Sequence, residues 1–299
     1  MASKPPRLRG GDLVGVAALS SAPDPAALAR GLAQLEAMGL AIRPASNLHM
    51  EQSGFAGSES ARLAGFHELV AADEVKAILF ARGGHGLLRI LPDLDWELMA
   101  SHRKAYVGYS DLTPLLNELV RRLDLICFHG PMVATELARP LSGAERSSLL
   151  PALEGRLERH LSCSIEGARE AVEGPLLGGC ISMLTAVVGT PYSPDLKGSI
   201  LFLEDINEPL YRLDRMLTHL QLSGTLDGVK AMVLGHLEAV DSSGDAALTR
   251  ARLCLPGEAG PAALAWGVQS GHGTPNLTLP LGARARLEPT SSELIVLEP

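Results

Sequence analysis

Short apolar runs alternate with amphipathic, capped segments from residue 12 to about residue 153. The runs that predict strands are residues 13–19, 40–43, 75–81, 105–109 and 125–128. Helices are expected between them at about 25–38, 59–72, after residue 110 and at 147–153. Asp24 with Pro25 is a helix start, and Pro114 suits a first turn, where a missing N–H costs nothing. This rhythm predicts a parallel sheet covered by helices on both faces.

The second half of the chain has a different pattern. From His160 onward, short strand-like segments are separated by glycine-rich turns. Only two helices stand out, at about 181–188 and 210–222, the second with leucines spaced along one face. We therefore place a boundary near residues 155–170 and expect two domains, 1–158 and 165–299.

The N-terminus faintly resembles a secretory signal, because three basic residues precede the apolar run at 13–19. Asp12 and Gly15 interrupt that pattern, and the run has the minimum length for a signal core, so a strand is the better interpretation. No apolar run approaches the ~20 residues that span a bilayer. We expect a soluble protein that does not engage a membrane.

Composition narrows the function classes. The 299 residues include 26 Lys plus Arg against 34 Asp plus Glu, a net charge of −8, with only 5 Phe, 4 Tyr and 2 Trp. An acidic chain poor in aromatic residues lacks the surface that nucleic-acid binding needs, so no nucleic-acid partner is expected. The four cysteines are far apart and signal neither a disulfide framework nor a zinc site, which fits a reducing, cytoplasmic compartment. They are Cys127, Cys163, Cys180 and Cys254.

Ser110 is the strongest candidate for chemistry, because ligands of parallel sheets bind beyond the carboxyl ends of the strands. It follows the strand at 105–109 and opens a helix, in the tetrapeptide Gly108-Tyr109-Ser110-Asp111. Gly108 allows close packing, and a tight turn can lift the hydroxyl above the sheet. The N–H of Asp111 would then face a developing oxyanion. The tetrapeptide alone favours the simpler interpretation that Ser110 is a helix N-cap.

Gly83 and Gly84 end the strand at 75–81 and offer free backbone N–H groups at close approach. They could donate the second oxyanion hydrogen bond. Two alternatives remain open: a phosphate-binding loop, although Arg82-Gly83-Gly84-His85-Gly86 matches neither nucleotide-binding motif, and a purely structural turn.

A serine nucleophile needs a base and a group that orients it. Among nine histidines, His272 lies in a loop flanked by glycines, and His129, which also follows a strand, is its main rival. Either could simply bond to backbone. Glu204 follows the apolar run at 199–203 and is the candidate for the carboxylate that orients the histidine. The alternative is that Glu204 simply forms an ion pair with Arg212 or Arg215.

These residues together resemble the LD-carboxypeptidases, serine peptidases that include microcin-type immunity peptidases. The similar blocks are spread over most of the chain, and their combination is specific although none would be alone. They are residues 82–86, 108–111, 129–131, 189–191, 201–205, 211–217 and 271–273.

The resemblance implies Ser110 as nucleophile, His272 as general base and Glu204 as its orienter, with the N–H groups of Gly84 and Asp111 as oxyanion hole. It implies an α/β fold: a parallel-sheet, flavodoxin-like N-terminal domain that carries the nucleophile, and a smaller, strand-rich, β-barrel-like swivelling C-terminal domain that carries Glu and His. A site between the domains, a homodimer, no cofactor and no metal are also expected.

The family's substrate is murein tetrapeptide, from which a terminal D-alanine is released during cytoplasmic wall recycling. Hydrolysis of an aminoacyl-nucleotide antibiotic is the alternative, but residues 129–191 contain no Phe, Tyr or Trp to stack on a base. His85 stands where the family more often has Tyr, so a contact of that loop can differ. An arginine near the site should bind the free terminal carboxylate.

Two rivals come from other classes: a non-catalytic small-ligand binding protein and a nucleotide-dependent enzyme. Neither explains why a glycine-flanked histidine and a strand-end glutamate accompany the serine.

Overall fold

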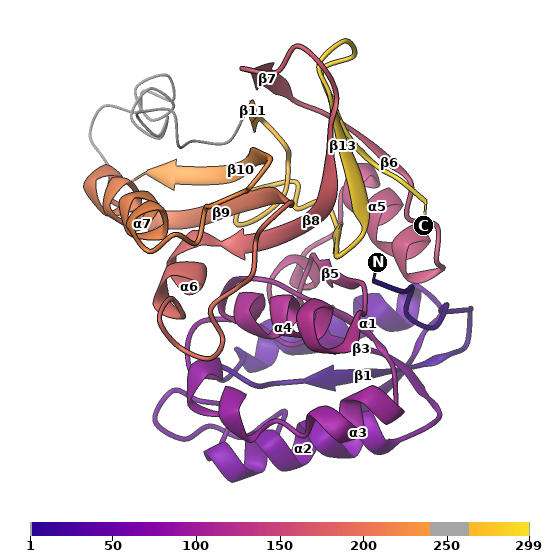
Figure 1. Ribbon diagram of the computed structural model, residues 1–299. Helices are drawn as coiled ribbons and strands as arrows, with labels where there is room; N and C mark the ends of the chain where they lie inside the picture. The colour runs from indigo at the N-terminus through magenta and orange to yellow at the C-terminus, as the bar shows by residue number, and fades with distance from the viewer. Residues whose placement is uncertain (1, 240–262, 299) are drawn as a thin grey trace.

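A computed structural model describes residues 2–239 and 263–298 of the chain and arranges them around two sheets (Figure 1). Cys254 lies outside the described residues, and the three described cysteines are buried and free. Among the residues described, no helix is both long and apolar enough to cross a membrane.

The first sheet has six strands in the order β12-β5-β4-β3-β1-β2. They are β1 (Leu13–Ala17), β2 (Ala41–Pro44), β3 (Val75–Phe80), β4 (Ala105–Gly108), β5 (Cys127–His129) and β12 (Leu279–Leu281). β1 to β5 are parallel, as the sequence pattern predicts. β12 comes from near the C-terminus and pairs antiparallel with β5, with Leu279 opposite His129.

Helices cover both faces of this sheet, which confirms the expected layering. α1 (Pro25–Ala37) and α5 (Gly143–Leu153) pack on one face; α2 (Glu59–Ala71), α3 (Trp96–Ser101) and α4 (Thr113–Leu123) pack on the other. α1 is capped as the sequence indicates, since the Asp24 side chain accepts the N–H of Ala27. α5 starts earlier than expected, because Ser142 and Glu145 form a capping box. Short 3₁₀ helices fill the connections: η1 (Leu87–Arg89), η2 (Leu91–Asp93), η3 (Ser110–Leu112) and η4 (Glu136–Ala138).

The second sheet has eight strands in the order β6-β14-β13-β8-β9-β10-β11-β7. They are β6 (Arg159–Ser162), β7 (Ser164–Glu166), β8 (Val172–Cys180), β9 (Ile200–Glu208), β10 (Ala231–Ala239), β11 (Ala263–Trp266), β13 (Arg284–Glu288) and β14 (Glu293–Val296). β8 to β11 are parallel and the flanking strands antiparallel. α6 (Ile181–Ala186) and α7 (Leu210–Leu222) cover one side of the parallel part (Figure 1).

The two sheets share a hydrophobic core. One cluster runs from Phe66 of α2 to Phe202 of β9 without a break. Polar bonds reinforce it: the Asn117 amide donates to the carbonyl of Gly178 and accepts from its N–H, at 2.9 and 3.1 Å. Thr113 Oγ1 accepts the N–H of Cys180 at 3.1 Å. The start of α4, which follows Ser110, is therefore fixed directly to the second sheet.

Candidate active site

Ser110 is the first residue of η3 and lies on the sharp turn by which β4 leads into that helix. Its φ of +62° is in the left-handed region, which a residue with a side chain adopts only when its surroundings enforce it. The residue that precedes η3 is Tyr109, and no side chain caps this helix. Ser110 is therefore not an N-cap, and its side chain is half-buried.

Two glycines make this turn possible. A methyl group added at Gly108 would lie 2.8 Å from the Phe80 ring, and one at Gly83 would lie 3.0 Å from Ser110 Oγ and 3.3 Å from the nitrogen of Asp111. Gly83 thus brings the end of β3 into direct contact with the candidate nucleophile.

Three distant segments meet at Ser110. His272 Nε2 lies 3.0 Å from Ser110 Oγ, and His272 Nδ1 lies 2.6 Å from Glu204 Oε2. The same carboxylate oxygen also accepts the backbone N–H of His272 at 3.0 Å. Because a carboxylate only accepts, Nδ1 carries the proton and Nε2 is left to accept from the Ser110 hydroxyl.

Glu204 sits at the end of the buried part of β9 and is fully buried. Burial raises the pKa of its carboxyl, and the hydrogen bond from His272 opposes that rise without cancelling it. For His272 the balance is different: burial lowers the pKa of the imidazole, but the hydrogen bond and charge of Glu204, helped by Asp205 and Glu136, raise it above the ordinary value. Glu204 therefore favours the charged imidazolium.

The two arginines considered as ion-pair partners of Glu204 contact other side chains instead. Arg212 pairs with Glu208 at 3.0 Å, and the Arg215 guanidinium lies over the ring of Tyr211.

His129, the rival base, is fully buried in β5, and neither ring nitrogen has a hydrogen-bond partner among the described residues. Its ring packs between those of Tyr109 and Phe202, at centroid distances of 5.3 and 5.1 Å. Burial lowers its pKa to about 3, so it stays neutral. His129 is a packing residue behind the site.

The N–H groups of Gly84 and Asp111 donate no hydrogen bond within the described part of the chain. The buried Asp111 carboxylate is committed to structure: Oδ2 accepts from the Ser20 hydroxyl at 2.6 Å and from the N–H of Leu87 at 2.9 Å. These bonds hold the Ser110 turn against the ends of β1 and η1. Asp111 follows Ser110 directly, and Gly84 follows Gly83, whose added methyl group would lie 3.0 Å from Ser110 Oγ, so both free donors belong to segments that meet at the candidate nucleophile.

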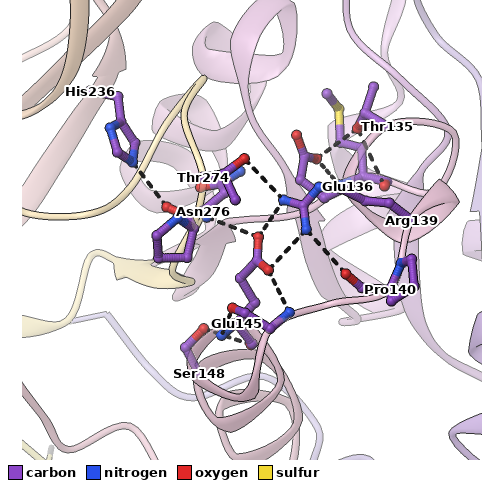
Figure 2. Close-up of polar contacts among 12 residues, drawn as sticks. Thr135, Glu136, Arg139, Pro140, Glu145, Ser148, His236, Thr274 and Asn276 are labelled. Atoms are coloured by element: carbon purple, nitrogen blue, oxygen red, sulfur yellow. Dashed lines mark hydrogen bonds and ion pairs between the residues drawn. The ribbon is translucent and has the colours of Figure 1, made fainter.

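Several residues that support the site were not anticipated from the sequence. The Tyr109 ring meets the His272 ring edge-on at 4.7 Å, and its hydroxyl donates to Glu136 at 2.6 Å. His236 Nε2 donates to the carbonyl of Pro275 at 2.9 Å (Figure 2). A methyl group at Gly273 would lie 2.3 Å from the His236 ring. The glycines around His272 were the available signal: they leave room for a packed ring and for a carboxylate.

His85 is the loop residue at which the family resemblance leads us to expect a tyrosine. Its Nδ1 lies 3.0 Å from Ser21 Oγ, and its ring packs on Phe55 at a centroid distance of 4.7 Å. In the part of the chain that the structure describes, no group of three or more His, Cys, Asp or Glu side chains is arranged to hold a metal ion.

Comparisons with known proteins identify the family of this chain. Residues 14–130 match the model of the LD-carboxypeptidase N-terminal domain, and residues 173–287 match that of the LD-carboxypeptidase C-terminal domain. A probable murein peptide carboxypeptidase of Bacillus subtilis is 36% identical over 302 residues, covering 99% of this chain and 94% of the relative. The microcin C7 self-immunity protein of Escherichia coli is 27% identical over 276 residues, covering 81% and 79%. The crystal structure of a muramoyltetrapeptide carboxypeptidase from Oxalobacter formigenes superposes with a TM-score of 0.82 at 29% identity, covering 95% of this chain and 97% of that one. The chain belongs to the LD-carboxypeptidase family.

Proposed function

We propose that this protein is a serine LD-carboxypeptidase that removes the terminal D-alanine from murein tetrapeptide in the cytoplasm. The observation that carries the proposal is the series of contacts from Ser110 Oγ to His272 Nε2, at 3.0 Å, and from His272 Nδ1 to Glu204, at 2.6 Å. The murein peptide carboxypeptidase relative, similar over the whole chain, supports this substrate. Three free, buried cysteines fit a reducing compartment.

In the proposed mechanism His272 takes the proton of Ser110 as the hydroxyl attacks the carbonyl carbon of the scissile bond. The N–H groups of Gly84 and Asp111 stabilise the oxyanion. His272 then protonates the leaving D-alanine, and water hydrolyses the acyl-enzyme by the same route. Glu204 stabilises the imidazolium that forms in each step.

Arg82 is our candidate for binding the terminal carboxylate of the substrate. It is the second residue after β3, and its guanidinium lies beside Gly84, with Nη2 3.8 Å from a methyl group placed there. Nη1 donates to the carbonyl of Ala22 at 3.2 Å, and no carboxylate among the described residues pairs with the side chain. Arg139, by contrast, is already paired with Glu145. Arg82→Gln should therefore remove the preference for a peptide with a free terminal carboxylate over its carboxamide.

The test of the function is release of free D-alanine from murein tetrapeptide. Wild-type protein should release it, and Ser110→Ala should lower kcat by roughly 10⁴ to 10⁶ while leaving the fold intact. Retained turnover in a clean Ser110→Ala preparation would reject the mechanism.

Hydrolysis of an aminoacyl nucleotide is the second candidate, supported by the similarity to the microcin self-immunity protein. An aminoacyl-sulfamoyl adenylate assayed in parallel separates the two, and we expect the tetrapeptide to be the better substrate, because residues 129–191 contain no Phe, Tyr or Trp to stack on a base. Tight binding of the tetrapeptide without turnover would instead indicate a binding protein.

We also propose a homodimer and two domains, 1–158 and 165–299, with β12 of the second range completing the sheet of the first. Sedimentation equilibrium tests the first, and a monomer at micromolar concentration would reject it.

A further inference from the structure

A buried carboxylate that the mechanism does not use binds the loop that carries His272. It lies on α5, which packs on the first sheet. Glu145, in the first turn of α5, is fully buried. Its Oε1 accepts the backbone N–H of Asn276 at 3.0 Å. Arg139 binds both oxygens, with Nη2 2.6 Å from Oε1 and Nη1 3.1 Å from Oε2, and the N–H of Ser142 donates to Oε2 at 2.8 Å (Figure 2). We call Arg139, Ser142, Glu145 and Asn276 the Glu145 network.

Asn276 passes this restraint on to His272. Its side-chain Oδ1 accepts the N–H of Gly271 at 2.9 Å, so both ends of the segment around His272 are tied to one residue. Gly271 also packs closely on Glu204, since a methyl group added there would lie 2.5 Å from Glu204 Oε2. A displacement of Asn276 is therefore passed on to Gly271, the residue directly before His272.

A second bond from the same helix acts in parallel. Ser148, one turn after Glu145, accepts the N–H of Thr278 at 3.0 Å through its hydroxyl oxygen. Asn276 and Thr278 are two residues apart in the extended segment that leads into β12, so their N–H groups point to the same side. Both donate to side chains of one turn of α5. α5 packs on the same sheet whose strand β4 presents Ser110.

The charge of Glu145 is permanent at any working pH. Burial alone would raise the pKa of its carboxyl, but the bonds from Arg139, Asn276 and Ser142 together lower it to about 2. A permanent negative charge with Arg139 fixed against it makes a rigid support, because both of its oxygens are already bonded.

We propose that Glu145 is a positioning residue, which through Asn276 and Gly271 holds Nε2 of His272 at hydrogen-bond distance from Ser110. The inference rests on the proposed function for its assay, but it concerns the geometry of the base and not the identity of the substrate. The Glu145 network thus links His272, the base, to the sheet whose strand β4 presents Ser110, although His272 and Ser110 are 162 positions apart in the chain.

The experiment compares Glu145→Gln, Glu145→Ala and Ser148→Ala with Glu118→Gln. Glu118 is the matched control: its side chain is 2% exposed and Arg121 binds it through two bonds of 2.6 Å, but it lies on α4 and does not touch the His272 loop. Two readouts are measured: kcat and KM for tetrapeptide, and the rate at which a fluorophosphonate labels Ser110, which needs the base but not the peptide.

Glu145→Ala should lower kcat and the labelling rate by about 10- to 100-fold with KM within about twofold, because displacing a catalytic base by 1 Å can cost as much. Glu145→Gln keeps an oxygen for the N–H of Asn276 but loses the ion pair, so about 3- to 10-fold is expected; Ser148→Ala should give a few-fold loss. Glu118→Gln should stay within about twofold of wild type. If Glu145→Ala does not fold, the other two variants carry the test.

Equal kcat and equal labelling rates in Glu145→Gln, Ser148→Ala and Glu118→Gln would overturn the proposal. So would a rise in KM with unchanged labelling, because that would make the Glu145 network part of substrate binding. If wild type is labelled at Ser110 yet releases no D-alanine, the murein substrate is wrong, and a slower labelling of Glu145→Gln still supports the positioning role.

Discussion

Replacing Glu204 with glutamine separates its charge from its hydrogen bonds. Only Oε2 of Glu204 is used, accepting both Nδ1–H and the backbone N–H of His272, while the buried Oε1 has no partner among the described residues. A glutamine can place its oxygen at the Oε2 position and its NH₂ at the Oε1 position. His272 then keeps its tautomer and orientation, and only the negative charge is lost.

The magnitude follows from the distance. Two unit charges 2.6 Å apart attract by about 6 kcal/mol at an effective dielectric constant of about 20. The neutral amide recovers part of this through its own hydrogen bond, so we expect the transition state to lose about 3 to 5 kcal/mol, a fall in kcat of about 10² to 10⁴. Stability should change by no more than about 1 kcal/mol, because removing a buried charge offsets the cost of an unpaired NH₂ group.

The pH profile gives a second measure of the same charge. His272 must be neutral to act as base, and Glu204 raises its pKa above the ordinary value of 6.5, so kcat/KM of wild type should rise with pH through a limb above 6.5. In Glu204→Gln that limb should move to lower pH, since burial, which lowers the imidazole pKa, is then less opposed. Asp205 and Glu136 also face the ring and remain, so the shift is partial.

Steady-state release of D-alanine between pH 5 and pH 9, with urea unfolding of the same preparations, measures both effects. A Glu204→Gln protein that folds normally and keeps more than about a tenth of wild-type kcat would refute the role given to the charge. An unchanged limb would show that His272 is not the group that titrates.

Two further changes test the surroundings of the site. Gly83→Ala should lower kcat at least about 10-fold, because its methyl group would lie 3.0 Å from Ser110 Oγ. Gly143→Ala is the control and should leave kcat unchanged, because nothing lies within 4 Å of a methyl group there. Equal kinetics in the two variants would contradict the close approach of Gly83 to Ser110. His129 has a pKa of about 3 in the folded protein and about 6.5 when unfolded, so the unfolded chain binds more protons below pH 6.5 and stability falls as pH drops. From pH 7 to pH 5 this lowers the free energy of unfolding by about 2 kcal/mol, and His129→Leu should remove that part of the loss in urea titrations at the two pH values. An equal loss in both proteins would show that folding does not lower the pKa of His129.

Much of the fold was visible in the sequence, because strands buried on both faces and capped helices leave periodic patterns. α5 began earlier than expected, since its first turn is polar and only the spacing of Ser142 and Glu145 marks it. β12 gave no strand signal at all. Its Pro280 cannot donate to a ladder, and it is tolerated because β12 is the edge strand and pairs with β5 alone.

The candidate site was predictable residue by residue, but its assembly was not. Ser110 follows a strand and His272 is flanked by glycines, and each pattern has an ordinary structural explanation. What removes that explanation for Ser110 is its positive φ at the start of η3, together with the close approach of Gly83 from the loop after β3. The support from Glu145 was missed for the same reason: 131 residues separate it from Asn276, and no local pattern encodes such a contact.

β12 also limits how this enzyme can be recombined. The polypeptide leaves the first sheet after β5 and returns to complete that sheet's edge beside β5, so a chimera that exchanges everything beyond residue 158 with a relative would import a foreign border strand. A fragment that stops there would leave the N–H and C=O groups of β5 open to pairing between molecules, which favours aggregation. Shuffling between relatives should succeed only where residues 279–281 travel with the N-terminal half.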